Sequence, residues 1–105
     1  MSDWITEVKS EEEFRAAIES GTVLIDFFAT WCPPCRAQLP ILEELAEKMA
    51  EKVKVVKVDT DALGGVAGEY QVSNIPTMVL LRDGKIIDRF VGLQQEATLR
   101  AAIEK

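Results

Sequence analysis

The sequence has no histidine and only two cysteines among its 105 residues. A structural zinc ion takes four protein ligands, so one chain could not complete such a site, although a dimer sharing one metal could. No apolar run approaches the roughly 20 residues that a transmembrane helix needs. Basic residues are also outnumbered, because 12 Lys and Arg stand against 18 Asp and Glu, for a net charge of −6. This balance argues against nucleic acid or an anionic membrane surface as a partner.

The first residues, 1–4, have neither the basic segment nor the apolar segment of an export signal. We therefore expect a cytoplasmic protein. In that reducing compartment, a nearby pair of cysteines is more often catalytic than structural. The length of 105 residues and the hydrophobic content of 48% suit one compact domain, residues 1–105, with a single core.

Both cysteines lie where an apolar run, residues 22–29, gives way to leucines at helical spacing in residues 33–49. This change of pattern predicts a buried strand followed by a helix with Cys32 at its N-cap. Unpaired backbone N–H groups and the helix dipole at that position favour a thiolate, which makes Cys32 the better nucleophile. Cys35 follows nearly one turn later, close enough for a disulfide. The pair is typical of a reversible, redox-active dithiol.

Three other interpretations compete with a redox role. A structural disulfide closing so short a loop would contribute only about 2 kcal/mol, against about 4.7 kcal/mol for a 100-residue loop. A zinc site lacks ligands within one chain. Two inert core cysteines are disfavoured because the intervening Pro33 and Pro34 suit the first turn of a helix better than a core.

The remaining pattern predicts an alternation of strands and helices. Ser10 and Glu13 form a capping box, which predicts a helix that ends near Gly21, and Asp83-Gly84 predicts a hairpin turn. Further strands are expected at residues 4–8, 53–58, 77–81 and 86–91, with helices at 62–70 and 96–104. This order predicts an α/β domain whose mixed sheet carries helices on both faces.

Asp26 interrupts an otherwise apolar strand. A carboxylate in such a run lies either at a protected site, where desolvation raises its pKa, or at a strand end that faces solvent. Lys57 alternates with valines and on the residues alone resembles an exposed sheet lysine. Pro76 could simply open a strand, since a cis bond cannot be read from sequence.

Taken together, the motifs resemble the thioredoxin family in order and spacing over nearly the whole chain. The residues that carry the resemblance are Asp26 to Ala29, Trp31-Cys32-Pro33-Pro34-Cys35, Pro40, Val58-Asp59, Ile75-Pro76-Thr77, Asp83-Gly84 and Val91-Gly92. The resemblance implies the thioredoxin fold, with a central mixed sheet flanked by helices. It also implies a thiol–disulfide oxidoreductase that reduces protein disulfides through a Cys32/Cys35 dithiol and a mixed disulfide.

The resemblance assigns roles to further residues. It implies that Asp26 exchanges a proton with Cys35 as the mixed disulfide resolves, and that Lys57 is the partner of this acid. It also implies a cis bond before Pro76, facing the cysteines, with the backbone of the preceding residue pairing with an extended substrate segment. An apolar docking patch would then surround Cys32, formed by Trp31, Ile75, Gly92 and Leu93. Pro40 is expected to kink the long helix.

As partners, the resemblance implies disulfide-containing substrate proteins and a separate thioredoxin reductase, a flavoprotein, that returns electrons. We expect a monomer with no bound cofactor and no metal. An oxidant or isomerase of the same fold remains an alternative, as do the membrane-tethered relatives that reduce apocytochromes, which residues 29–36 also resemble. Those relatives carry an export segment and an insert, and neither is visible here.

Two positions depart from the usual family pattern. Pro33 replaces a glycine between the cysteines, which removes one backbone N–H near Cys32 but presets a helical φ, so the sign of its effect on the thiolate is undecided. Phe28 stands where the family usually has tryptophan. The missing indole donor is expected to loosen that side of the site.

Overall fold

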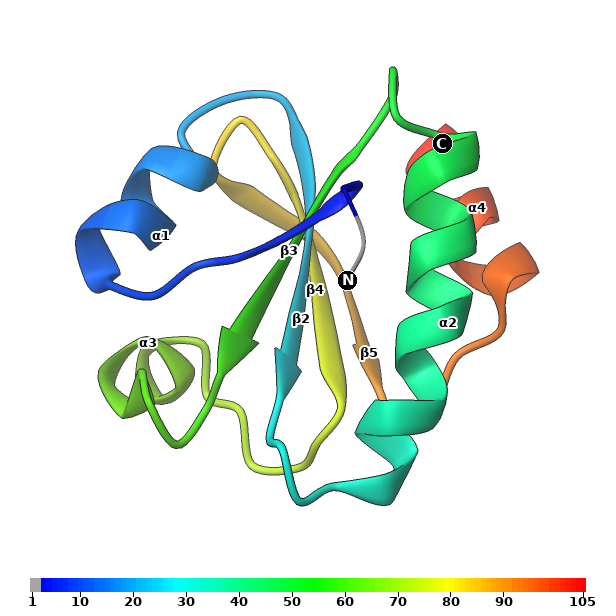
Figure 1. Ribbon diagram of the computed structural model, residues 1–105. Helices are drawn as coiled ribbons and strands as arrows, with labels where there is room; N and C mark the ends of the chain where they lie inside the picture. Colours follow the sequence, from blue (N-terminus) through cyan, green and yellow to red (C-terminus); the bar gives the residue numbers. More distant parts are fainter. Residues whose placement is uncertain (1–2) are drawn as a thin grey trace.

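The computed structural model describes residues 3–105. These described residues form five strands and four helices in the order β1 Ile5–Glu7, α1 Glu11–Ala17, β2 Thr22–Phe28, α2 Pro33–Lys48, β3 Lys54–Asp59, α3 Gly64–Glu69, β4 Thr77–Arg82, β5 Lys85–Val91 and α4 Glu96–Glu104. The strands make one sheet in the order β1-β3-β2-β4-β5 (Figure 1). The pairs β1–β3 and β2–β3 are parallel, whereas β2–β4 and β4–β5 are antiparallel. The sheet is therefore mixed, as predicted.

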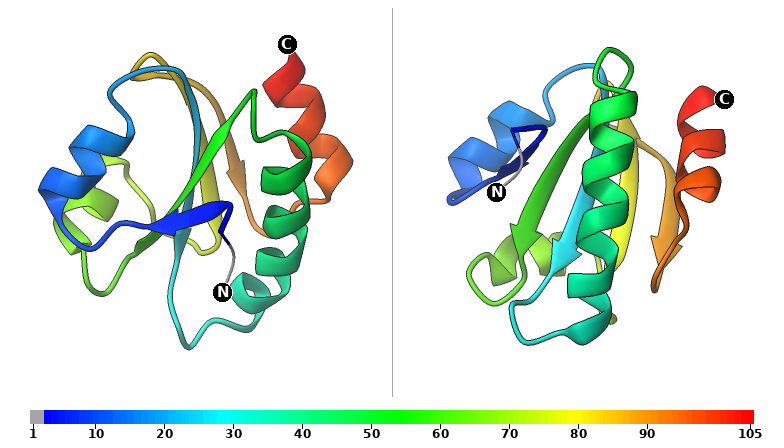
Figure 2. Two further views of the ribbon diagram at one scale, coloured as in Figure 1. Left: turned by 45° about the horizontal axis from the view of Figure 1, so that its top comes forward. Right: turned by 45° about the vertical axis from the view of Figure 1, so that its right-hand side comes forward.

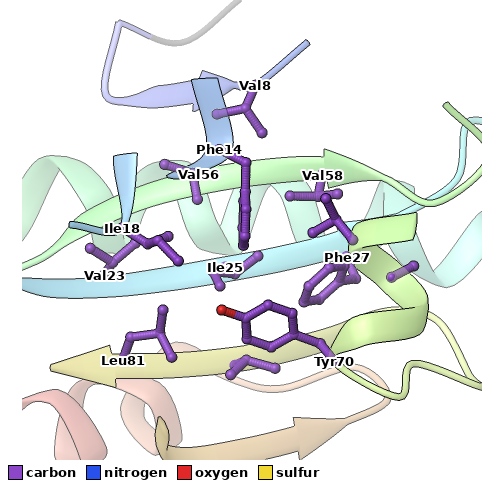
Figure 3. Close-up of a cluster of buried hydrophobic side chains, with 13 residues drawn as sticks. Val8, Phe14, Ile18, Val23, Ile25, Phe27, Val56, Val58, Tyr70 and Leu81 are labelled. Carbon is purple, nitrogen blue, oxygen red and sulfur yellow. The ribbon is translucent and has the colours of Figure 1, made fainter. Parts of the chain in front are cut away.

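Helices cover both faces of this sheet. Figure 2 shows α1 and α3 on one face and α2 and α4 on the other. Successive side chains of β2 point to opposite faces of the sheet, so the core has two parts. Ile25 and Phe27 pack on the α1/α3 side, with Phe14 and Tyr70 (Figure 3). Leu24 packs on the α2/α4 side. Asp26 has the same parity as Leu24, so it points toward the face that α2 covers.

The first helix is shorter than the sequence predicts. Ser10 is its N-cap, and the Ser10 side chain accepts from the Glu13 N–H at 3.1 Å, as expected. The helix ends at Ala17, however, and the prediction that it runs to near Gly21 is wrong. Gly21 instead pairs with the β4–β5 hairpin, since its N–H donates to Asp83 Oδ1 at 2.8 Å and its carbonyl accepts from the Asp83 N–H at 2.9 Å.

One edge of the sheet gathers the segments that carry the predicted chemistry. The carboxyl ends of β2, β3 and β5 and the amino end of β4 lie there, and α2 begins directly beside them (Figure 1). Loops at such an edge come together although their residues are far apart in sequence. Over residues 3–105, no helix is both long enough and apolar enough to cross a bilayer.

Candidate active site

The two cysteines form a disulfide at the start of α2. Cys32 is the N-cap of this helix, with an extended backbone (φ −92°, ψ 109°), and its Sγ accepts from the Cys35 N–H at 3.2 Å. Pro33 and Pro34 occupy the first two helical positions and carry no N–H, so the Cys35 amide is the first available donor of the helix. The predicted N-cap position of Cys32 is confirmed.

Both cysteines are buried. Cys32 is 3% exposed and Cys35 is 4% exposed, and they pack with Phe28, Ala29 and the half-buried Ile75. The Cys32 Sγ lies 3.8 Å from the carbonyl oxygen of Ile75. The Ile75–Pro76 peptide bond is cis. The structure thus brings the loop before β4 against the sulfur pair, as the resemblance implied.

Asp26 lies within the protein at 1% exposure. Burial raises its pKa from 3.8 to about 7, and the positive charge of Lys57 opposes part of that rise. Its Oδ1 makes no hydrogen bond with the described residues. A pocket of about 210 Å³ is lined by both Asp26 and Cys35, together with Lys57, Arg36 and other residues of this region. The buried interpretation of Asp26 is confirmed, and the solvent-facing one is wrong.

Lys57 is directly opposite Asp26 on the neighbouring parallel strand. The register places both side chains on the α2 face of the sheet, and Lys57 is half-buried there. Its Nζ lies 4.4 Å from the centre of the Phe28 ring, in cation–π contact. Phe28 is 7% exposed, and it packs against the cysteines as well as facing the lysine.

The remaining predicted site residues lie around the rim of this region. Gly92 adopts φ +88°, and its N–H donates to the Pro76 carbonyl at 2.8 Å, which holds the end of β5 against the loop before β4. Trp31 and Leu93 are large exposed apolar residues, at 64% and 44% exposure. The Trp31 indole N–H donates to Asp61 Oδ2 at 2.8 Å.

The chain matches the thioredoxin family model over residues 5–105. It belongs to the thioredoxin family. Among curated relatives, it is 46% identical over 101 residues to a thioredoxin of Chlamydia trachomatis, covering 96% of this chain and 98% of the relative. It is 40% identical over 96 residues to a thioredoxin of Bacillus subtilis, covering 91% and 92%. A solved mutant thioredoxin from Halobacterium salinarum superposes with a TM-score of 0.90 at 37% identity, over 99% of this chain and 92% of that one.

Family membership and the cysteine pair together establish the activity. This thioredoxin-family protein is a thiol–disulfide oxidoreductase of the protein-disulfide reductase type, with Cys32 and Cys35 as the redox-active pair. Its fold is the thioredoxin fold. Within residues 3–105, no group of three or more His, Cys, Asp or Glu side chains is arranged to hold a metal ion.

The sequence patterns did not indicate Gln38, Gln94 or Asp61 as site residues. Gln38 is fully buried in α2, and its side chain binds the backbone of Gln94, beyond the end of β5. One signal could have drawn attention to it. Gln38 falls three residues after Cys35 and four before Leu42, on the apolar stripe of the helix, where a polar side chain must find a buried partner.

Proposed function

We propose that this thioredoxin-family protein reduces disulfides of other proteins through its Cys-Pro-Pro-Cys segment, with Cys32 as the nucleophile and Cys35 as the resolving cysteine. The observation that carries this assignment is the Cys35 N–H donated to Cys32 Sγ at the first turn of α2. An amide donor and the positive end of a helix both stabilise a thiolate more than a thiol. Cys35 lies inside the first turn and lacks this capping position.

The reaction proceeds by two sulfur exchanges. The Cys32 thiolate attacks one sulfur of the substrate disulfide, forming a mixed disulfide, and the other substrate sulfur leaves as a thiolate that takes a proton from water. The Cys35 thiolate then attacks Cys32 Sγ, and the second substrate sulfur leaves in the same way. The substrate has gained two electrons, and the protein retains the Cys32–Cys35 disulfide.

Asp26 accepts the proton that Cys35 must lose before the second exchange. Burial supports this role, because an acid with a pKa of about 7 can both accept and release a proton near neutrality. The pocket that Asp26 and Cys35 both line is large enough for water to carry the proton between them. Lys57, opposite Asp26, keeps the carboxylate form accessible by limiting the rise of its pKa.

Substrate proteins dock on the apolar surface around the sulfur pair, through Trp31, Ile75, Pro76, Gly92 and Leu93. An extended substrate segment pairs with the backbone of Ile75, whose carbonyl already faces Cys32. Exposed apolar side chains on the rim suit partners of varied sequence, since burying them needs no particular hydrogen-bond pattern.

A separate thioredoxin reductase returns electrons to the oxidised protein, which acts as a cytoplasmic monomer and needs no bound cofactor. An oxidant or isomerase built on this fold would have a higher reduction potential than a reductase. Equilibration with reduced and oxidised glutathione, followed by mass spectrometry of the two protein forms, separates these functions.

Insulin reduction with serine variants tests the assignment of the cysteines. We expect Cys32→Ser to abolish turnover and Cys35→Ser to accumulate a covalent mixed disulfide, visible by non-reducing mass spectrometry. The double variant is the matched control, because the chain then contains no thiol. Turnover by Cys32→Ser at the wild-type rate would refute the proposed roles.

A further inference from the structure

Gln38 makes a paired contact between α2 and the loop that follows β5. Its Nε2 donates to the Gln94 carbonyl at 3.0 Å, and its Oε1 accepts from the Gln94 N–H at 2.7 Å. The side-chain amide therefore satisfies both backbone groups of one residue, as a neighbouring strand would. Gln38 is fully buried and Gln94 is half-buried, so water has limited access to these bonds.

Further hydrogen bonds continue from Gln94 to the loop before β4. The Gln94 side chain donates to the carbonyls of Val91 and Gly92, at 3.3 Å and 3.2 Å. Gly92 in turn donates its N–H to the Pro76 carbonyl at 2.8 Å. A connected set of hydrogen bonds thus runs from the helix that carries the cysteines to the loop that faces them.

The loop at residues 92–95 depends on such contacts for its position. It lies between the end of β5 at Val91 and the start of α4 at Glu96, and it belongs to no helix or strand. Gly92 is in the left-handed region, at φ +88°, where the backbone turns sharply away from the sheet. Removing the Gln38 amide would leave the N–H and carbonyl of Gln94 without these partners in a half-buried place, which favours movement of the loop.

Contacts other than those of Gln38 hold the sulfur pair in place. Cys32 Sγ is fixed by the Cys35 amide and lies against the Ile75 carbonyl, and neither contact involves Gln38 or the loop. A change at Gln38 should therefore alter how a protein docks on the exposed Leu93 and its neighbours without altering sulfur exchange.

We propose that Gln38 is a positioning residue that holds the loop at residues 92–95 and thereby sets the affinity for protein disulfides. This proposal rests on the proposed function, since it takes Gly92 and Leu93 to be part of the docking surface. The contacts that position Cys32 Sγ, with the Cys35 amide and the Ile75 carbonyl, do not include Gln38. Its effect should appear in KM for a protein substrate and not in kcat.

The test compares Gln38→Leu with wild-type protein on two substrates. Insulin must dock on the loop, whereas the small disulfide of Ellman's reagent needs only access to Cys32. We expect Gln38→Leu to raise KM for insulin about tenfold, the equivalent of one buried hydrogen bond, with kcat and the rate on Ellman's reagent within about twofold of wild type. Leu42→Val is the matched control, because Leu42 is equally buried on the same helix but packs only in the core.

Gln38→Glu provides a second variant with a pH signature. A protonated glutamate can donate and accept as the amide does, whereas its carboxylate can only accept. At each pH, the KM of this variant for insulin is divided by that of wild type. We expect this ratio to be lower at about pH 6.5 than at about pH 8.5, because protonation restores both bonds. Ionisation of a buried glutamate also lowers the stability of the fold as the pH rises, so circular dichroism must show a folded variant at both pH values, and its rate on Ellman's reagent, relative to wild type, must be the same at both. With that control, this variant keeps the proposal testable if Gln38→Leu does not fold.

Hydrogen exchange gives a reading that does not depend on activity. We expect amides of residues 91–95 to exchange about tenfold faster in Gln38→Leu than in wild type or Leu42→Val. Unchanged exchange, an unchanged KM, or an equal loss on both substrates would each overturn the proposal. Failure of the wild-type protein to reduce insulin would instead remove the proposed function, and the exchange comparison would still decide whether Gln38 holds the loop.

Discussion

Replacing Asp26 by asparagine should make the protein more stable at alkaline pH. The substitution keeps the size of the side chain but removes its charge. Burial raises the pKa of Asp26 from 3.8 to about 7, so the folded protein holds this proton more tightly than the unfolded chain does. For a raised carboxyl pKa, stability is greatest below the unfolded value and falls as the pH rises toward the folded value. The loss therefore takes place between about pH 4 and about pH 7.

The size of this effect follows from the shift. About 3 pKa units at about 1.36 kcal/mol each correspond to roughly 4 kcal/mol of stability lost once Asp26 is ionised in the folded state. The side chain is 1% exposed, so solvent screening reduces this figure little. Asparagine has no ionised form and avoids the loss. At about pH 4 the two proteins should differ little, and at about pH 8 the variant should be the more stable by up to about 4 kcal/mol.

Urea unfolding of the oxidised proteins at several pH values measures this difference. The disulfide form is used because its cysteines do not titrate. Asp3→Asn, at an exposed carboxylate, is the matched control and should follow the wild-type curve at every pH. A constant difference between wild type and Asp26→Asn from about pH 4 to about pH 8 would refute the buried, raised-pKa assignment.

Two further substitutions test neighbouring parts of the site. Lys57→Met should raise the pKa of Asp26 further, because a nearby positive charge is lost, as measured by carbon NMR titration of the carboxyl. Lys54→Met, on the opposite face of the same strand, should leave that titration unchanged, and equal shifts in both variants would contradict the pairing. Leu93→Ser should raise KM for insulin about threefold through lost apolar contact, whereas Ile87→Ser, at a similar exposure of 43% against 44%, should not.

Local signals in the sequence were sufficient to predict much of the fold. The N-cap position of Cys32 was predictable because the apolar strand and the leucine spacing of the helix meet at that residue. The closing helix was predicted with its observed bounds, since Leu99 and Ile103 recur at helical spacing and form its buried face. The end of α1 was not, because Gly21 pairs with Asp83 from a distant hairpin and not with its own helix.

Long-range relations at the site were harder to predict from the residues alone. Alternation along a strand shows which residues share a face, but not that Asp26 is opposite Lys57, because that depends on the register of two parallel strands. The approach of Ile75 to Cys32 came only from the family resemblance. The contact of Gln38 with Gln94 joins residues 56 positions apart, and a single polar residue on an apolar stripe does not indicate its partner.

The reactivity of Cys32 in the reduced protein tests the central physical claim most directly. If the start of α2 and the Cys35 amide hold this sulfur as a thiolate, iodoacetamide should label Cys32 before Cys35, and about tenfold faster than free cysteine in mildly acidic buffer. Peptide mass spectrometry at short reaction times gives both rates. Labelling of Cys32 no faster than free cysteine would contradict the claim.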